Sequence, residues 1–182
     1  RDDRVLRPFN YPPGAPGQGS TIAESHSGHK VAVLCLQGRT SMPSTDCPFR
    51  LGKAEVERLR EQTPIIFIDF HAEATAEKVA LGWYLDGLAS AIIGTHTHVQ
   101  TADERILPQG TAYLTDAGMT GPHDSVIGVQ PEQAIRRFLT QVPTRFKPAD
   151  KGARFCGVLV DIDPDSGKAT HIERLQIEET TT

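Results

Sequence analysis

The sequence predicts a single α/β domain built around a largely parallel sheet. Three short apolar runs, each typical of a strand buried on both faces, alternate with two stretches of helical character. In a strand–helix–strand order, neighbouring strands run parallel, because the helix returns the chain to the same end of the sheet. The 182 residues are enough for one domain with a substantial core.

The chain opens with a segment that is crowded with proline and glycine, residues 7–20. No Gly-Lys-Ser/Thr ending follows its glycines, so we expect a covering surface loop rather than a phosphate-binding loop. The first buried strand is predicted at residues 31–36. Residues 53–62 then predict an exposed helix, since they are mostly charged and polar around Ala54 and Leu59.

A second strand, helix and strand follow directly. Residues 65–68 predict a buried strand, and residues 74–84 predict a helix that Asp86-Gly87 ends. Helical spacing places four apolar side chains of this helix on one face: Ala76, Val79, Ala80 and Trp83. Residues 90–94 give the third strand of the pattern.

The last third of the chain predicts a further strand, a helix and a hairpin. The strand lies at residues 111–115, and Pro131 starts a helix to about residue 139 with three inward side chains, Ile135, Phe138 and Leu139. Residues 157–162 and 169–177 flank the turn sequence Asp-Pro-Asp-Ser-Gly, which indicates a hairpin. We expect one domain over residues 1–177 and a flexible polar tail over residues 178–182.

Composition narrows the classes of function. A net charge of −4 gives no general attraction to nucleic acid or to anionic membranes, and no apolar run is long enough to span a bilayer. The three cysteines, Cys35, Cys47 and Cys156, are odd in number and widely spaced. This pattern argues against a disulfide framework and favours a cytoplasmic location. The charge and the lack of a long apolar run argue against a membrane partner.

Histidines end two of the predicted strands. His71 closes the second strand, and His96-Thr97-His98 follows the third. Because parallel strands end at the same edge of a sheet, and imidazole binds zinc, iron and manganese, the pattern predicts a metal site at that edge. On a regular strand, His96 and His98 would project to the same side and serve one metal or two adjacent metals. The alternative is that they are ordinary surface histidines.

Several neighbouring side chains have two interpretations each. Asp69 either orients an imidazole or caps the following helix, and Glu73 either serves the site or complements the helix dipole. Thr95 and Thr97 either hydrogen-bond phosphate or metal-bound water, or are simply strand-forming residues. Two basic residues are conceivable phosphate contacts: Arg39 and Lys78.

Three segments carry a family resemblance. They are Asp69-Phe70-His71-Ala72-Glu73-Ala74-Thr75, then Gly94-Thr95-His96-Thr97-His98-Val99-Gln100-Thr101-Ala102-Asp103, then Gly110-Thr111-Ala112-Tyr113 through Thr115-Asp116-Ala117-Gly118-Met119-Thr120-Gly121. Together they resemble the YmdB-like branch of the calcineurin-like metallophosphoesterases. The resemblance implies an αββα sandwich of two mixed sheets flanked by helices, in a bacterial phosphodiesterase that hydrolyses cyclic nucleotides, notably 2′,3′-cyclic ones.

The resemblance also implies a cofactor and a set of site residues. It implies two transition-metal ions, of iron, manganese or zinc, with His71 and His96 on one and His98 on the other. A hydroxide held between the metals would attack phosphorus. Thr97 and Glu73 are candidates for contacting the substrate, a small cyclic nucleotide or phosphodiester. A homo-oligomer is compatible with this interpretation.

The sequence departs from the family pattern in one respect. An early aspartate, a bridging acidic residue with its asparagine, and an asparagine–histidine pair that includes the expected general acid have no counterpart. We therefore expect a truncated metallophosphoesterase domain that lacks its amino-terminal strands, has an unpaired strand edge and shows little or no turnover. The alternative is a non-catalytic binding or structural domain that retains the fold.

Overall fold

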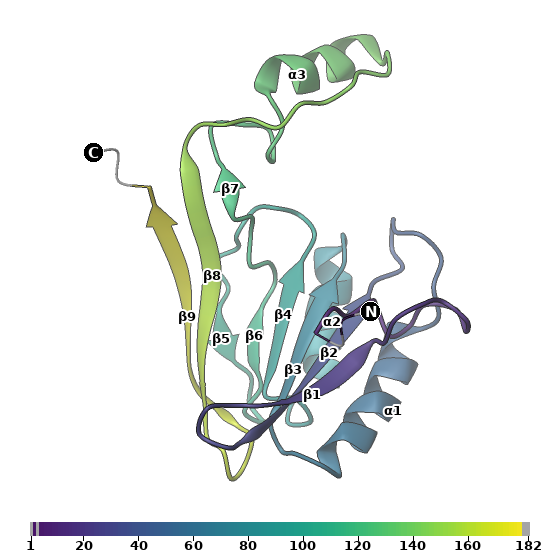
Figure 1. The fold of residues 1–182 in the computed structure, drawn as a ribbon, viewed down its shortest axis with the longest axis vertical. Coiled ribbons are helices and arrows are strands. Elements are labelled where there is room, and N and C mark those ends of the chain that lie inside the picture. The colour runs from purple at the N-terminus through teal and green to yellow at the C-terminus, as the bar shows by residue number, and fades with distance from the viewer. Residues whose placement is uncertain (1, 3, 180–182) are drawn as a thin grey trace.

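The computed structural model describes residue 2 and residues 4–179, which form a mixed α/β fold with two sheets and three helices (Figure 1). In the larger sheet, the four central strands run parallel and the two edge strands run antiparallel to their neighbours. Its order is β1 (Ser20–Glu24), β2 (Lys30–Gln37), β3 (Ile66–His71), β4 (Ala91–Thr95), β6 (Ala112–Leu114) and β5 (Arg105–Ile106).

The smaller sheet is antiparallel and consists of β7 (Gly121–Pro122), β8 (Ala153–Ile162) and β9 (Ala169–Glu178). β8 and β9 are the predicted hairpin. On its other side, β8 pairs only with the two residues of β7, at Ala153 and Arg154, within the part of the chain that the structure describes. The rest of that edge of β8 has no strand partner among the described residues.

The helices α1 (Pro48–Arg60) and α2 (Thr75–Tyr84) cover one face of the larger sheet. Alternate side chains of β2 and β3 point into this layer, where the main core contains Leu34, Leu36, Ile66, Ile68, Phe70, Val56, Leu59, Leu81 and Leu85. The hairpin packs against part of the opposite face, where Phe67 of β3 lies with Val160 and Ile172. The larger sheet is therefore the middle layer.

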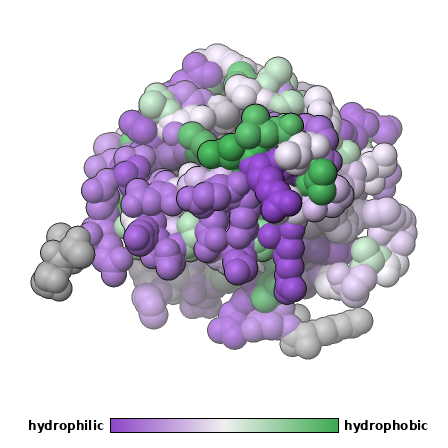
Figure 2. All heavy atoms as spheres, turned by 90° about the horizontal axis from the view of Figure 1, so that it is seen from above, coloured by the Kyte–Doolittle hydropathy of each residue, from purple (hydrophilic) through white to green (hydrophobic). Residues whose placement is uncertain are grey.

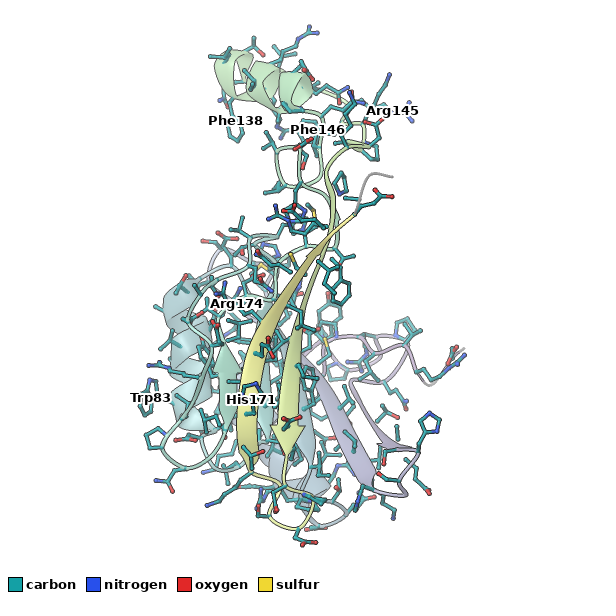
Figure 3. The ribbon with its side chains drawn as sticks, turned by 90° about the vertical axis from the view of Figure 1, so that its left-hand side faces the viewer. Trp83, Phe138, Arg145, Phe146, His171 and Arg174 are labelled. Carbon is teal, nitrogen blue, oxygen red and sulfur yellow. The ribbon has the colours of Figure 1, made fainter. Side chains whose placement is uncertain are left out.

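The helix α3 (Pro131–Thr140) stands clear of both sheets (Figures 1 and 3). Figure 2, which looks down on this end of the molecule, shows apolar side chains gathered in a strip that hydrophilic side chains border. The prediction that Ile135, Phe138 and Leu139 face inward is wrong: Phe138 is 74% exposed and Leu139 is 80% exposed. The amphipathic pattern is real, but none of the described elements covers its apolar face.

Two further predictions about helices are wrong. α1 is longer than predicted and is not simply exposed, because Val56 and Leu59 are buried against the sheet. α2 does not bury the predicted face: Trp83 is 51% exposed, whereas Lys78 and Leu81 are buried. An ion pair described below compensates the charge of Lys78, and hydrophobic periodicity cannot anticipate such compensation.

The ends of the chain differ in detail from the predictions. Sequence patterning does not predict β1, because its sequence Ser-Thr-Ile-Ala-Glu contains few apolar residues. Glu178 belongs to β9 rather than to a loose tail, and Glu179 donates its backbone N–H to the carbonyl of Ala153. The remainder of the predicted tail, residues 180–182, lies outside the described residues.

Candidate functional site

The register of the parallel strands brings the predicted residues to one edge of the larger sheet. His71, the last residue of β3, is paired with Gln37 on β2 and with Thr95 on β4. Asp116 follows β6 two residues beyond its end. The carboxyl ends of four adjacent strands thus meet where open α/β sheets place their chemistry.

The backbone turns sharply where β4 ends. Gly94 has no side chain, and a Cβ there would collide with the carbonyl of Thr115. After Thr95 the chain leaves the strand, and His96 and His98 both adopt positive φ angles, 107° and 67°. The expectation that these two imidazoles project from a regular strand is therefore wrong. Strained backbone of this kind is concentrated at functional sites.

A chain of hydrogen bonds orients the imidazole of His71. Thr95 donates its hydroxyl proton to Oδ1 of Asp69 over 2.8 Å, and its Oγ1 lies 3.0 Å from Nδ1 of His71. Since Thr95 has only one hydroxyl proton, Nδ1 of His71 is the donor in the second bond. Asp69 thus acts on the imidazole through Thr95, whereas the N-cap of α2 is Ala74. The interpretation of Asp69 as a helix cap is wrong.

This tautomer leaves Nε2 of His71 with a lone pair that faces the second histidine. Nε2 lies 3.0 Å from Nδ1 of His96, and the two rings are nearly perpendicular, at 87°. Burial and the neighbouring His96 lower the pKa of His71, so its imidazole is neutral at neutral pH. The Nε2 lone pair therefore accepts the Nδ1–H of His96, and a metal bound at Nε2 would take the place of this hydrogen bond.

The carboxyl groups on either side of the imidazoles differ in their surroundings. Oε2 of the half-exposed Glu73 lies 3.1 Å from Nε2 of His96, so Glu73 belongs to the same cluster. Burial raises the pKa of Asp69, although the hydrogen bond from Thr95 partly opposes this shift. The cluster thus combines two imidazoles with the half-exposed carboxylate of Glu73 and the half-buried carboxyl group of Asp69.

A buried ion pair stabilises the backbone turn that follows β4. Nζ of Lys78 lies 2.7 Å from Oδ2 of Asp116, and these side chains are 1% and 0% exposed. Oδ2 also accepts the backbone N–H of Thr97 over 3.0 Å, and Oδ1 accepts the N–H of Gly118 over 2.9 Å. The pair therefore fixes the residue between His96 and His98. Because Lys78 is buried, its interpretation as a phosphate contact is wrong.

His98 lies apart from this pair. Its ring is exposed, and Nδ1 donates to the carbonyl of Ile127 over 3.0 Å. In residue 2 and residues 4–179, no group of three or more His, Cys, Asp or Glu side chains is arranged to hold a metal ion. The adjacent ring nitrogens of His71 and His96, 3.0 Å apart, are chemically suited to be two donors to one metal. The described donors do not complete a site for two metals.

Sequence reasoning missed two buried polar residues at this edge. Asp116 could have been found, because it follows a predicted strand just as His71 does. Asn10 could not have been found in this way, because it lies in the predicted opening loop rather than at the end of a predicted strand. Its side-chain amide donates to the carbonyl of Gln37 over 2.8 Å and its Oδ1 accepts the N–H of Gln37 over 2.9 Å. It thereby ties the opening loop to the end of β2.

Two sheets in face contact, with paired imidazoles at a carboxyl edge, define an α/β protein with a histidine-based candidate active site. The chain belongs to the YmdB-like protein family, whose model matches residues 1–175. It is 53% identical over 173 residues to the 2′,3′-cyclic-nucleotide 2′-phosphodiesterase of Bacillus subtilis. The match covers 95% of this chain but only 65% of that relative, so the chain spans about two thirds of its length.

Solved structures show the same fold. A hypothetical protein from Thermus thermophilus matches with a TM-score of 0.90 and 43% identity, over 96% of this chain and 68% of that protein. A Mycoplasma pneumoniae protein described as a novel phosphatase matches with a TM-score of 0.88 and 38% identity, over 97% of this chain and 64% of that protein.

Proposed function

We propose that the protein is a metal-dependent phosphodiesterase that hydrolyses 2′,3′-cyclic nucleotides. The observation that carries the proposal is the pairing of His71 and His96 at the carboxyl edge of the sheet, with the His71 lone pair directed at its neighbour. The similarity to the Bacillus subtilis enzyme supports the choice of substrate. The positions of Thr97 and Glu73 beside these imidazoles are compatible with contacts to that substrate.

We propose His71, His96 and His98 as metal ligands, with the remaining ligands coming from outside the described residues. Two bound iron, manganese or zinc ions would supply a water of lowered pKa and positive charge for the phosphoryl oxygens. The residues of this chain orient the imidazole of His71. Asp69 and Thr95 hold one tautomer of His71, and such supporting hydrogen bonds typically change metal affinity by about 10–100-fold.

The test uses the complete gene product, including any sequence that flanks this chain. Bound metal is measured by mass spectrometry and the hydrolysis of 2′,3′-cyclic AMP by chromatography, in the wild type and in His71→Ala, His96→Ala and His98→Ala. We expect each variant to lose metal and at least about 100-fold of activity. The matched control is His171→Ala, which removes an exposed imidazole from β9 (Figure 3). It should retain both properties.

Two further variants test the orientation of His71. Thr95→Val removes the hydrogen-bond partner of Nδ1 and should weaken metal binding about 10–100-fold, whereas Thr95→Ser keeps the hydroxyl and should bind metal as the wild type does. A complete gene product without transition metal and without activity on 2′,3′-cyclic AMP would contradict the proposal. It would favour a non-catalytic domain, for which the separate position of His98 is the motivating observation.

We also propose a cytoplasmic location. None of the helices within the described part of the chain is both long and apolar enough to cross a membrane. Cys35, Cys47 and Cys156 are all free thiols, which is typical of a reducing compartment. Fractionation of cells that express the tagged protein would test this assignment.

A further inference from the structure

Glu73 lies in the segment between β3 and α2, beside the candidate site. The N-cap of α2 is Ala74, so Glu73 precedes the helix, and the acidic residue of the first turn is Glu77. Oε2 of Glu73 lies 3.1 Å from Nε2 of His96, and none of the other described residues forms an ion pair with it. Within that part of the chain, this carboxylate is thus committed to an imidazole of the candidate metal site.

A backbone hydrogen bond brings Glu73 and His96 together. Ala72 donates its N–H to the carbonyl of Thr95 over 3.3 Å, and each of these two residues is followed directly by one member of the pair. His96 also has a φ of 107°, which an L-residue rarely adopts. Such a conformation persists only where the surrounding contacts maintain it. The contact with Glu73 is therefore one of those that hold His96 in place.

Each of the paired imidazoles has one nitrogen that a carboxyl group supports and one that faces the other ring. Nδ1 of His71 donates to Thr95, which in turn donates to Asp69. Nε2 of His96 lies against the Glu73 carboxylate, and because an ionised carboxylate only accepts hydrogen bonds, this nitrogen carries a proton. The other two nitrogens, Nε2 of His71 and Nδ1 of His96, lie 3.0 Å apart. The supporting contacts thus direct these two nitrogens toward each other.

We propose that Glu73 is a positioning residue for His96: its carboxylate accepts the Nε2–H and so reserves Nδ1 for a metal. This inference rests on the proposed function, because it assigns a role at the same site. A carboxylate that accepts the second N–H of a metal-binding imidazole fixes the ring and makes it a better donor. Glu73 would serve His96 directly, as Asp69 serves His71 through the hydroxyl of Thr95.

The first experiment measures the affinity of the complete gene product for Zn²⁺, by competition with a chromophoric chelator. Glu73→Ala should bind zinc about 10–100-fold more weakly than the wild type. Glu73→Gln keeps an oxygen acceptor at the same reach and should bind zinc more tightly than Glu73→Ala. The control is Glu173→Ala, which removes a similarly exposed carboxylate 3.7 Å from His171 on β9 and should bind zinc as the wild type does. Circular dichroism confirms folding, which these half-exposed positions should not affect.

A second experiment separates positioning from direct binding of the metal. If Glu73 acts through His96, adding Glu73→Ala to His96→Ala should change zinc affinity by less than about twofold. A further tenfold loss would make Glu73 a ligand itself and overturn the proposal. Nitrogen-15 NMR of the zinc-loaded wild type should find the remaining proton of the His96 ring on Nε2, and a proton on Nδ1 would equally overturn it.

Zinc affinity and kinetics together distinguish this inference from the proposed function. Wild-type affinity in Glu73→Ala, with a loss in His96→Ala, would overturn the positioning role alone. If that Glu73→Ala variant also had a raised KM for 2′,3′-cyclic AMP, Glu73 would be a substrate contact only. Wild-type affinity in both variants would overturn the proposed function as well.

Discussion

Replacement of Lys78 by methionine should strongly destabilise the protein. The substitution keeps most of the buried side-chain volume but leaves Asp116, which is 0% exposed, without its cation. Breaking a buried ion pair by removing one partner costs about 3–5 kcal/mol, because the other charge remains uncompensated. The backbone N–H groups of Thr97 and Gly118 still bind the carboxylate, so we expect a value near the lower limit, about 3 kcal/mol.

Urea unfolding, followed by circular dichroism, measures this loss as a lower midpoint at an unchanged slope. The matched control is Lys53→Met, whose ammonium forms an exposed ion pair with Glu57 over 3.9 Å and should contribute less than about 1 kcal/mol. The double variant Lys78→Met/Asp116→Asn should recover part of the loss, since it buries no charge. A cost for Lys78→Met no larger than that of Lys53→Met would refute the role assigned to the pair.

Three further predictions concern thiols, a glycine and pH. Burial alone would raise the pKa of the Cys47 thiol, but hydrogen bonds from the backbone lower it. Burial and the charge of Asp69 raise the pKa of the Cys35 thiol to about 12. Iodoacetamide should therefore alkylate Cys47 before Cys35, as followed by mass spectrometry, and the reverse order of alkylation would contradict the prediction. Gly94→Ala drives a Cβ into a strand-end carbonyl and should lower the free energy of unfolding by about 3 kcal/mol, a prediction that wild-type stability in urea would disprove. Although burial opposes the shift, the ion pair with Lys78 and the hydrogen bonds lower the pKa of Asp116 below its ordinary value of 3.8. The ionised carboxylate therefore stabilises the folded state fully above about pH 3.8, and this contribution is lost as the pH falls below that value. Between neutral pH and about pH 3, Asp116→Asn should lose less stability than the wild type.

The strand pattern could be predicted from sequence because each central strand is a short apolar run with a clear boundary. β2 and β4 lie within one residue of the predicted ranges, β3 extends three residues further, and their parallel order is confirmed. The same logic places His71 at a sheet edge. What could not be predicted is which partner covers a given face. Amphipathic spacing points Phe138 and Trp83 inward, yet each depends on a neighbour that spacing does not specify.

The arrangement of the candidate site was predictable in part. The convergence of His71 with the residues after β4 follows from strand order, but the direction of each ring depends on backbone angles that the sequence does not encode locally. Glu73 reaches His96 because the chain turns after β3, and the carboxylate of Asp116 reaches Thr97 because of a similar turn after β4. Polar contacts of this kind arise from tertiary structure rather than from periodicity.

The left-handed backbone at His96 and His98 implies a conflict between robustness and chemistry. An L-residue in this conformation is disfavoured by about 1–2 kcal/mol, and glycine would avoid that steric penalty. Laboratory evolution towards heat resistance alone would therefore tend to discard these two imidazoles. Their persistence under a screen that also demands turnover, and their disappearance under one that does not, would distinguish a retained active centre from a relic.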